Sequence, residues 1–282
     1  MRPTVALIND TSLFEDHFGC LLVGQTFREQ FARTGLDLKY AFPRDYELDT
    51  IAPLLEKVDL VVVNGEGSIH HGKRNHLLDV ARRFPSVLVN AVYQENPRNE
   101  ALDRFLYRSA RESQSADEVR QLGLQCDVTP DVIFAAMQLR SFVKPDPIED
   151  LGVTDSVLKK RRTIGPIQLK KQAYGFRPNT SVANYLHTLS SYQRLCIGRF
   201  HAVVAASVLG IPFSCWESNT WKISGLMQDM GAPEYCYTNF SQAFDNVPAL
   251  FDDRIQVFAD GAVGRIESMF DNIATIAGGA AD

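Results

Sequence analysis

Short apolar runs alternate along the chain with segments whose apolar residues recur at helical spacing. Thr4–Ile8 is a β-rich run, and Leu21–Arg33 then keeps apolar residues at helical intervals. A strand over Leu38–Phe42 and a helix near Leu48–Lys57 repeat this order. Val58–Val63 is the clearest strand signal, because an unbroken apolar run is typical of a strand that is covered on both faces. The pattern predicts an α/β fold with mainly parallel sheets.

The alternation continues to the end of the chain with one interruption. Residues 141–158 carry Pro145 and Pro147 with several acidic positions and no sustained periodicity. A chain of 282 residues has room for two domains of roughly 140 residues each. We therefore predict an N-terminal Rossmann-like domain over residues 1–140, a linker over 141–160 and a C-terminal Rossmann-like domain over 161–282. The other predicted elements are strands at Val87–Val92, Val128–Phe134, Thr163–Ile167, Tyr192–Ile197 and Tyr235–Tyr237, and helices at Ala101–Tyr107, Ser115–Gly123, Ser181–Leu189, Ala202–Leu209, Ile223–Met230 and Ala262–Ile276.

The composition is ordinary for a soluble globular protein, with 45% hydrophobic and 22% charged residues. A formal net charge of −5 argues against general nucleic-acid binding, because phosphate backbones are held by clustered Lys and Arg. The one basic run, Lys159–Arg162, is interpreted as a solvated helix end. Five cysteines without C-x-x-C spacing indicate small buried thiols, and neither disulfides nor a zinc site.

The first residues, MRPTVALIND, form a strand-like run without the apolar core of a signal peptide. No segment approaches the ~18 consecutive apolar residues that a membrane span needs. We expect a cytoplasmic protein that works in solution or as a peripheral protein at the inner face of the membrane.

The most informative stretch is Leu195–Lys222, where an apolar run, a polar turn and a helix rich in small residues follow one another. Gly198 breaks the run, and Arg199 and His201 stand at the start of the helix. In open α/β sheets, ligands bind at such a turn. A guanidinium and an imidazole beside a helix N-terminus favour a phosphate or a carboxylate. The structural alternative is that both side chains serve only the surface and the packing.

Lys222 adds a second positive charge at the end of the same stretch. Its structural alternative is that Trp216 and Trp221 pack in the interior while the lysine extends past them to water.

The first strand ends in a second group of candidates. Asp10, Thr11 and His17 follow it, where contacts with a ligand are expected. The alternative is that Asp10 and Thr11 cap a helix and His17 packs.

The strand at Val58–Val63 breaks into Asn64–Gly72, NGEGSIHHG, which we interpret as a turn that lines a site. Gly65 and Gly67 allow the backbone to approach a ligand closely, and Ser68 suits the cap of a following helix. The G-x-G pattern gains weight only from its place directly after a buried strand.

Glu66 and His70 suit the roles of base or acid in that turn. His70, His71 and His76 do not form an H-x-x-x-H pair, so we predict no metal. Surface or packing roles fit His71 and His76.

Together these segments resemble the polysaccharide pyruvyl transferase family. The most specific part is IGRFHAVVAASVLGIPF followed by Lys222, which is similar to that family's G-x-R-x-H, small-residue helix, G-I-P and Lys pattern. VVVNGEGSIHH is similar to its glycine-rich turn. ARESQSADEVRQLG and TPDVIF are similar to its Arg-x-x-x-Ser helix and Pro-Asp segment. The resemblance covers roughly residues 58–231.

The resemblance implies two Rossmann-like domains that face a cleft in the GT-B manner. It implies transfer of the pyruvyl group of phosphoenolpyruvate onto a saccharide or lipid-linked saccharide of the cell envelope, without a further cofactor. The small anionic donor would contact the C-terminal domain through Gly198, Arg199, His201 and Lys222, with His201 also able to move a proton. Base candidates on the acceptor side are Glu66, Asp10 and His70, beside the ligand loop of Asn64, Gly65, Gly67, Ser68, Thr11 and His17.

Glu66 occupies a place where that family has glycine, and this difference favours a second hypothesis. The chain would then be a GT-B glycosyltransferase that uses a nucleotide-activated acidic sugar of the sialic or Kdo type. Arg199, His201 and the helix N-terminus would hold the donor's phosphate, and Glu66 would activate the acceptor hydroxyl. A third hypothesis is a carbohydrate or nucleotide-sugar binding module without catalysis. The acceptor sugar, the linkage and the oligomeric state are left open.

Overall fold

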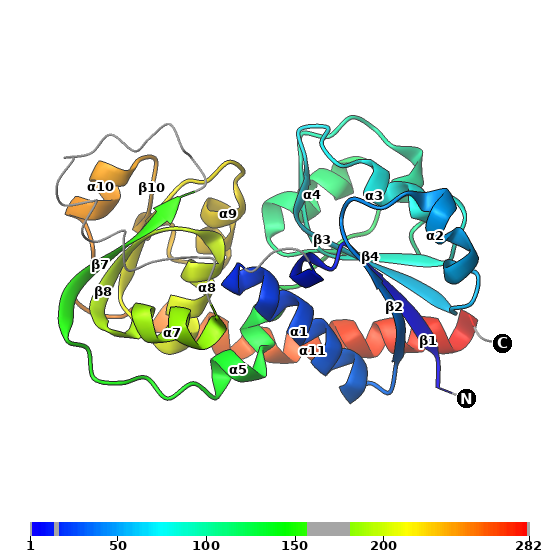
Figure 1. Ribbon diagram of the computed structural model, residues 1–282. Helices are drawn as coiled ribbons and strands as arrows, with labels where there is room; N and C mark the ends of the chain where they lie inside the picture. Colours follow the sequence, from blue (N-terminus) through cyan, green and yellow to red (C-terminus); the bar gives the residue numbers. More distant parts are fainter. Residues whose placement is uncertain (1, 14–16, 157–180, 281–282) are drawn as a thin grey trace. The chain divides into compact units, whose positions relative to one another are not determined.

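The computed structural model describes residues 2–13, 17–156 and 181–280 (Figure 1). The chain divides into two compact α/β units. Unit 1 consists of Met1–Phe14, Val23–Val132 and Gly264–Asp282, and unit 2 of Glu15–Leu22 and Ile133–Val263. The helices α1 (Phe18–Arg33) and α11 (Asp253–Ala280) each contribute residues to both units.

Unit 1 is built on a six-stranded sheet in which every pair is parallel and the order is β2-β1-β3-β4-β5-β6. β3 and β4 are buried along almost their whole length, which is why their sequences read as nearly continuous apolar runs. The chain reverses its direction of travel across the sheet between β1 and β3, and such a switch point is where open α/β sheets bind ligands. The strands are β1 (Thr4–Ile8), β2 (Asp37–Phe42), β3 (Leu60–His70), β4 (Ser86–Gln94), β5 (Tyr107–Ala110) and β6 (Asp127–Val128).

Helices pack on this sheet through apolar faces. Phe27 and Phe31 of α1 meet Phe270 of α11 edge-on, with ring centroids 5.4 and 5.6 Å apart. All three rings are buried, so the end of the chain belongs to the core of unit 1. The other helices of unit 1 are η1 (Thr11–Leu13), α2 (Leu48–Leu55), α3 (His76–Asp79), η2 (Val80–Arg82), η3 (Glu100–Arg104) and α4 (Ser113–Gln121).

Unit 2 has a four-stranded parallel sheet in the order β10-β9-β8-β7. Helix α8 (Phe200–Leu209) is buried from Phe200 to Ser207, and its small residues allow this close packing. It ends at Gly210, whose φ of 62° is the left-handed conformation that glycine adopts at low cost. The strands are β7 (Glu149–Ser156), β8 (Tyr192–Gly198), β9 (Phe213–Trp216) and β10 (Cys236–Tyr237). The other helices are α5 (Met137–Arg140), α7 (Val182–Ser190), α9 (Lys222–Asp229), η6 (Pro233–Tyr235) and α10 (Phe240–Asp245), with η4 (Val132–Ala135) at the boundary.

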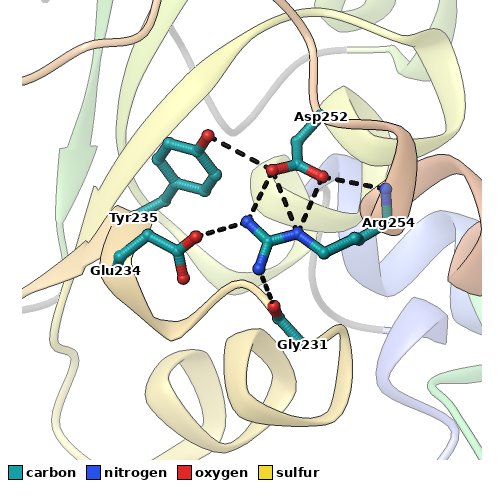
Figure 2. Close-up of polar contacts among 5 residues, drawn as sticks. All are labelled: Gly231, Glu234, Tyr235, Asp252 and Arg254. Atoms are coloured by element: carbon teal, nitrogen blue, oxygen red, sulfur yellow. Dashed lines mark hydrogen bonds and ion pairs between the residues drawn. The ribbon is translucent and has the colours of Figure 1, made fainter.

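An ion-pair network holds the start of α11 in unit 2 (Figure 2). The Arg254 guanidinium donates to the carboxylates of Asp252 and Glu234 and to the carbonyl oxygen of Gly231. Asp252 also accepts from the backbone N–H of Arg254 at 2.8 Å and from the Tyr235 hydroxyl at 3.2 Å. The hydrogen bonds from Arg254 are the main reason that the pKa of Asp252 falls to about 2. These groups use one another as partners, so the network supports the fold.

The predicted turn at Asn64–Gly72 is wrong over most of its length. β3 continues to His70 because Glu66 pairs with Ala91 of β4 and His70 pairs with Gln94. Ser68 is therefore a strand residue, and the next helix, α3, begins only at His76.

Three predicted elements further along the chain also differ. Residues Ala101–Tyr107 form η3 and the start of β5 instead of one helix, because β5 pairs with β4. The cap of α4 is Glu112, whose side chain accepts from the Ser115 N–H at 2.8 Å, and Ser115 itself lies in the helix. Of the last predicted strand in this half, Val128–Phe134, only Val128 lies in a strand (β6), and Val132–Ala135 forms η4.

The predicted boundaries differ from the two units at both ends of the second half. β7 lies inside residues 141–160, where a linker is predicted, and it pairs with β8. The terminal helix begins at Asp253, well before the predicted Ala262, and its C-terminal part belongs to unit 1. The predicted strand Thr163–Ile167 and the basic run Lys159–Arg162 lie outside the described residues.

Two further findings concern covalent structure and hydropathy. All five cysteines are described, and none forms a disulfide. In the described part of the chain, no helix is both long enough and apolar enough to cross a lipid bilayer.

Candidate functional site

Four nitrogen-bearing side chains, which we name the cationic cluster, gather in unit 2: His17, Arg199, His201 and Lys222. Arg199 is the cap residue of α8 and directly follows β8, and His201 is the second residue of that helix. Lys222 is the first residue of α9, which follows β9, and His17 directly precedes α1. Three of the four therefore stand where strands of the parallel sheet have ended and helices begin, the usual place for an anion.

Arg199 is held by the neighbouring strand. Its Nε donates to Asp155 Oδ2 at 3.0 Å, and its Nη2 donates to the same oxygen. Asp155 is in β7, where the next residue, Ser156, pairs with Gly198. The side chains of Arg199 and Asp155 are 22% and 30% exposed, so the pair borders on solvent and the guanidinium is fixed in direction without being enclosed.

Gly198 is needed where it lies because Trp216 packs against it. A Cβ at this position would lie only 2.7 Å from Cε2 of the Trp216 indole. The Gly198 N–H donates to Thr154 Oγ1 at 2.9 Å, which fixes the turn into α8. Gly198 thus shapes the turn that carries Arg199.

Lys222 and its surroundings complete the turn at α9. Its Nζ donates to Asn219 Oδ1 at 2.9 Å. Trp216 is buried against Gly198, as the packing alternative expects, whereas Lys222 itself is only partly buried. The buried hydroxyl oxygen of Thr220, two residues before Lys222, has no hydrogen-bond partner among the described residues.

His201 is buried by aromatic and glycine neighbours. Its ring lies edge-on to Phe200 and Phe18, with centroids 5.5 and 6.4 Å away. A Cβ on Gly19 would overlap the His201 ring and lie 2.7 Å from the His201 Cβ. The first turn of α1 therefore packs directly on the histidine that the sequence places at the start of α8.

His17 is the residue whose location differs most from the sequence-based expectation. The sequence predicts it on the acceptor side of the N-terminal domain, but His17 belongs to unit 2 and its ring centroid lies 6.1 Å from that of His201. Burial lowers the pKa of His17 to about 3, and the charges of His201, Arg199 and Lys222 act in the same direction. The imidazole is therefore neutral at pH 7.

Tyr185 joins the first turn of α1 to α7. Its ring stacks on Phe18 with a centroid distance of 3.6 Å and an interplanar angle of 9°. Burial and the nearby Asp155 raise the pKa of the Tyr185 hydroxyl well above its usual range, so this group stays protonated. The cluster thus combines two permanent cations, one neutral histidine and His201 against an apolar floor, which suits a phosphate or carboxylate.

Unit 1 carries a second polar group at its switch point, which we name the amide cluster: Asn9, Asn64 and Asn90. Asn9 Nδ2 donates to the Asn64 carbonyl at 2.5 Å, and Asn64 Nδ2 donates back to the Asn9 carbonyl at 3.1 Å. Asn90 Nδ2 donates to Asn64 Oδ1 at 3.0 Å. Asn9 and Asn90 have φ of 61° and 55°, which Asn tolerates better than most residues. Neither is among the predicted site residues; in the sequence Asn9 directly follows the apolar strand β1, and Asn90 interrupts the apolar run of β4.

Asp10 and Thr11 lie beside the amide cluster in unit 1. Asp10 Oδ1 accepts from the Ser12 N–H at 3.1 Å and from its hydroxyl at 2.5 Å, and Oδ2 accepts from Arg28 at 2.6 Å. These are the contacts of a capping and ion-pairing residue, and they favour the structural alternative for Asp10. Thr11 is buried, and its hydroxyl oxygen has no hydrogen-bond partner among the described residues.

The candidates from the predicted turn lie along β3. Glu66 is 7% exposed and has a φ of 41°, which is strained for a residue other than glycine. Gly65 is required by packing, because a Cβ there would lie 2.5 Å from the Ala91 Cβ. Ser68 is 3.4 Å from Asn9 Nδ2, so it belongs to the same polar group, while Gly67 is partly exposed.

His70 closes β3, and its Nδ1 lies 2.8 Å from Nδ1 of His71. His71 in turn approaches Glu95, with Nε2 3.2 Å from Oε2. The described residues include no group of three or more His, Cys, Asp or Glu side chains arranged to hold a metal ion.

Arg111 and Ser115, the Arg and Ser of the Arg-x-x-x-Ser pattern, hold together elements of unit 1. Arg111 and Asp131 form a buried ion pair of 2.7 Å, with side chains 2% and 0% exposed. Ser115 donates to Glu112 and accepts from the Tyr93 N–H at 2.9 Å. Ser115 thus ties α4 to β4, the Arg111–Asp131 pair joins the segment after β5 to the segment after β6, and each of these two buried charges has a partner, as burial demands.

Fold and site together define an α/β protein of two Rossmann-like units with parallel sheets, as is typical of GT-B-like proteins, and the predicted fold class is confirmed. No protein-family profile and no curated protein sequence matches the chain.

Solved structures do resemble it. An uncharacterised protein from Klebsiella pneumoniae has a TM-score of 0.57 at 13% identity, over 84% of this chain and 93% of that one. A UDP-GlcNAc 2-epimerase from Methanocaldococcus jannaschii has a TM-score of 0.54 at 14% identity, over 98% of this chain and 100% of that one. At such identities the likeness concerns the fold.

Proposed function

We propose that the chain is a transferase of saccharide metabolism that holds a small anionic donor in the cationic cluster of unit 2. The observation that carries the proposal is the gathering of Arg199, His201 and Lys222 at the starts of α8 and α9. Two permanent cations and a helix N-terminus favour a ligand with more than one negative charge. Phosphoenolpyruvate has this character, because it carries a phosphate and a carboxylate.

In pyruvyl transfer, phosphoenolpyruvate loses its phosphate, and the carbon that carried the phosphate gains two bonds to saccharide hydroxyl oxygens. The chemistry needs cations for the donor, an acid for the methylene carbon and a base for the hydroxyls. Arg199, fixed by Asp155, offers directed guanidinium donors, and His201 is the candidate for the proton. Glu66, Asp10 and His70 stay predictions as bases, and the contacts of Asp10 make it the weakest of them.

A nucleotide-sugar donor is the second candidate function. It is supported by the likeness in fold to a protein named as a UDP-GlcNAc 2-epimerase and by the buried Glu66 in place of glycine. The phosphates of such a donor would bind the same cationic cluster. An acceptor saccharide, free or lipid-linked, is common to both candidates.

The proposal is tested by thermal shift and by release assays with phosphoenolpyruvate and, separately, with a panel of CMP and UDP sugars. Stabilisation by phosphoenolpyruvate with release of phosphate supports pyruvyl transfer. Stabilisation by nucleotide sugars alone would reject pyruvyl transfer in favour of the second candidate. Binding of a donor without turnover would support the third hypothesis, a carbohydrate or nucleotide-sugar binding module without catalysis.

Arg199→Ala is expected to weaken donor binding at least ~10-fold, because a charge-assisted hydrogen bond contributes about 1.5–3 kcal/mol. The strand β8, which ends just before Arg199, provides a matched control, Arg194→Ala. Arg194 pairs with Asp150 through Nε at 3.0 Å and Nη2 at 2.9 Å, and this pair is at the exposed start of the strand. The control is expected to leave donor binding unchanged. Equal affinity of the two variants would show that the cationic cluster is not the donor site.

A further inference from the structure

The segment that begins α1 is built into unit 2 by three contacts. Phe18 stacks on Tyr185 at 3.6 Å, Gly19 lies against His201, and His17 lies 6.1 Å from His201 between ring centroids. All of these residues belong to the same compact unit. The segment therefore brings its own imidazole to the cationic cluster, although more than 180 residues of sequence separate it from Arg199.

A backbone hydrogen bond selects the tautomer of His17. The Gly19 N–H donates to His17 Nδ1 at 3.1 Å, so this nitrogen carries a lone pair and not a proton. In the neutral ring the proton must then reside on Nε2, which becomes a hydrogen-bond donor. Protonation of Nδ1 would break the bond to Gly19, which opposes the formation of an imidazolium.

We propose that His17 is a positioning and specificity residue of the anion site, at which its Nε2–H donates to the phosphate of the bound ligand while the ring stays uncharged. This inference rests on the proposed function, because the proposed function assigns an anionic ligand to the cationic cluster. The inference adds a contact from the residue before α1 and defines the protonation state of His17.

The surroundings of His17 explain why a neutral donor is favoured. Among the described residues, the charged and titratable groups that face His17 are His201 and Arg199 at the start of α8, Lys222 at the start of α9, and, through Arg199, Asp155 on β7. A positive charge on His17 would be repelled by the permanent charges of Arg199 and Lys222. An uncharged N–H adds a directed hydrogen bond without that repulsion, and this donor does not itself titrate between about pH 5 and 8.

The protonation state can be tested on the wild-type protein. Long-range ¹H–¹⁵N spectra of the full chain with ¹⁵N-histidine would show His17 as the Nε2–H tautomer at pH 7, with no titration between pH 5 and 8. A His17→Asn sample assigns the signal. A titration near pH 6.5, or a proton on Nδ1, would overturn the inference whatever the function of the protein.

The contact between His17 and the phosphate is tested with two variants, one that mimics only the Nδ1 group and one that mimics only the Nε2 group. His17→Asn keeps an acceptor at the position of Nδ1 and a residue suited to cap α1, but it has no group at the position of Nε2. His17→Gln places an amide N–H₂ near that position. We expect His17→Asn to weaken the binding of inorganic phosphate, measured by calorimetry, about 10-fold, and His17→Gln to retain most of it.

Arg199→Ala in the same experiment separates the two proposals. If it loses phosphate binding and His17→Asn does not, the anion site stands and the role of His17 is rejected. If neither variant changes the affinity, or if the wild-type protein does not bind phosphate, both the anion site and the role of His17 are rejected. Circular dichroism of each variant confirms that a loss of binding is not a loss of folding.

Discussion

Gly19 is the residue on which the geometry of His201 depends. The α1 backbone approaches the imidazole so closely that a side chain at position 19 would overlap the ring and lie 2.7 Å from the His201 Cβ. Because the Cβ is part of the overlap, rotation of the ring does not relieve it. A residue that looks like an ordinary helix glycine in the sequence thus sets the position of a candidate catalytic group.

Gly19→Ala is expected to displace His201 or the first turn of α1 and to weaken phosphate binding several-fold. It should also destabilise the protein by about 1–3 kcal/mol, as overpacking does in a filled interior. The control is Gly261→Ala in α11, where a Cβ meets nothing within 4 Å. This variant should leave binding unchanged and stabilise the helix by up to about 1 kcal/mol. Urea unfolding and calorimetry measure both effects, and a Gly19→Ala protein with wild-type stability and phosphate affinity would contradict the close contact.

At the scale of elements, side-chain amides join the residue that follows β1 to the middle of β3 and of β4. Asn64 is central, because it donates to Asn9 on one side and accepts from Asn90 on the other. The remaining oxygen of the Asn9 side chain is buried and has no hydrogen-bond partner among the described residues. Buried polar groups of this kind are stable only when nearly all of them are paired.

Asn64→Ala removes both side-chain contacts and leaves a buried acceptor on Asn9 and a buried donor on Asn90 without their partner. We expect the free energy of unfolding to fall by about 2–6 kcal/mol, at roughly 1–3 kcal/mol for each of the two unpaired groups. The comparison is Asn246→Ala, which removes one exposed amide that donates to Gln242 at 2.7 Å and should change stability by less than about 0.5 kcal/mol. Equal midpoints in urea would show that the amide cluster does not hold these strands together.

At the scale of the whole molecule, His17 links the site to stability in acid. Its pKa is about 3 in the folded protein and near 6.5 in the unfolded chain. The unfolded state therefore takes up a proton first, so the stabilising contribution is complete above pH 6.5 and is lost as the pH falls towards 3. The lowered pKa of Asp252 acts in the same direction, but only from about pH 3.8 down to about 2.

Between pH 6.5 and 4.5 the wild-type protein should therefore lose up to about 2 kcal/mol of unfolding free energy that His17→Asn does not lose. Urea unfolding at the two pH values measures the difference. His76→Asn, a change at an exposed histidine, is the control and should behave as the wild type does. A wild-type curve parallel to that of His17→Asn would mean that the imidazole is not shielded in the folded state.

Several elements follow from local sequence alone. Thr4–Ile8 is a strand within the predicted bounds, because side chains on both of its faces are apolar and are buried by helices. The helix predicted at Ser181–Leu189 is α7, which begins at Val182; Ser181 caps it through a hydrogen bond of 3.3 Å from the Asn184 N–H, a bond between residues only three apart. The end of α8 at Gly210 also follows from local sequence, because the glycine itself adopts the left-handed conformation that ends the helix.

Other elements depend on partners that are distant in the sequence. Asn64–His70 reads as a turn because it contains two glycines, yet Ala91 and Gln94 of β4 extend it as a strand. Glu149–Ser156 has weak local signals and becomes β7 by pairing with β8. In both cases hydrogen bonds between strands outweigh local propensity.

The candidate site shows the same division. The turn after β8, with Gly198, Arg199 and His201, is recognisable from the order of apolar, glycine and polar residues, because a strand and the helix that follows it are neighbours in the chain. The presence of His17 beside them is not recognisable in this way. It arises from the stacking of Phe18 on Tyr185 and from the absence of a side chain at Gly19, and such contacts exist only once α1, α7 and α8 have packed together.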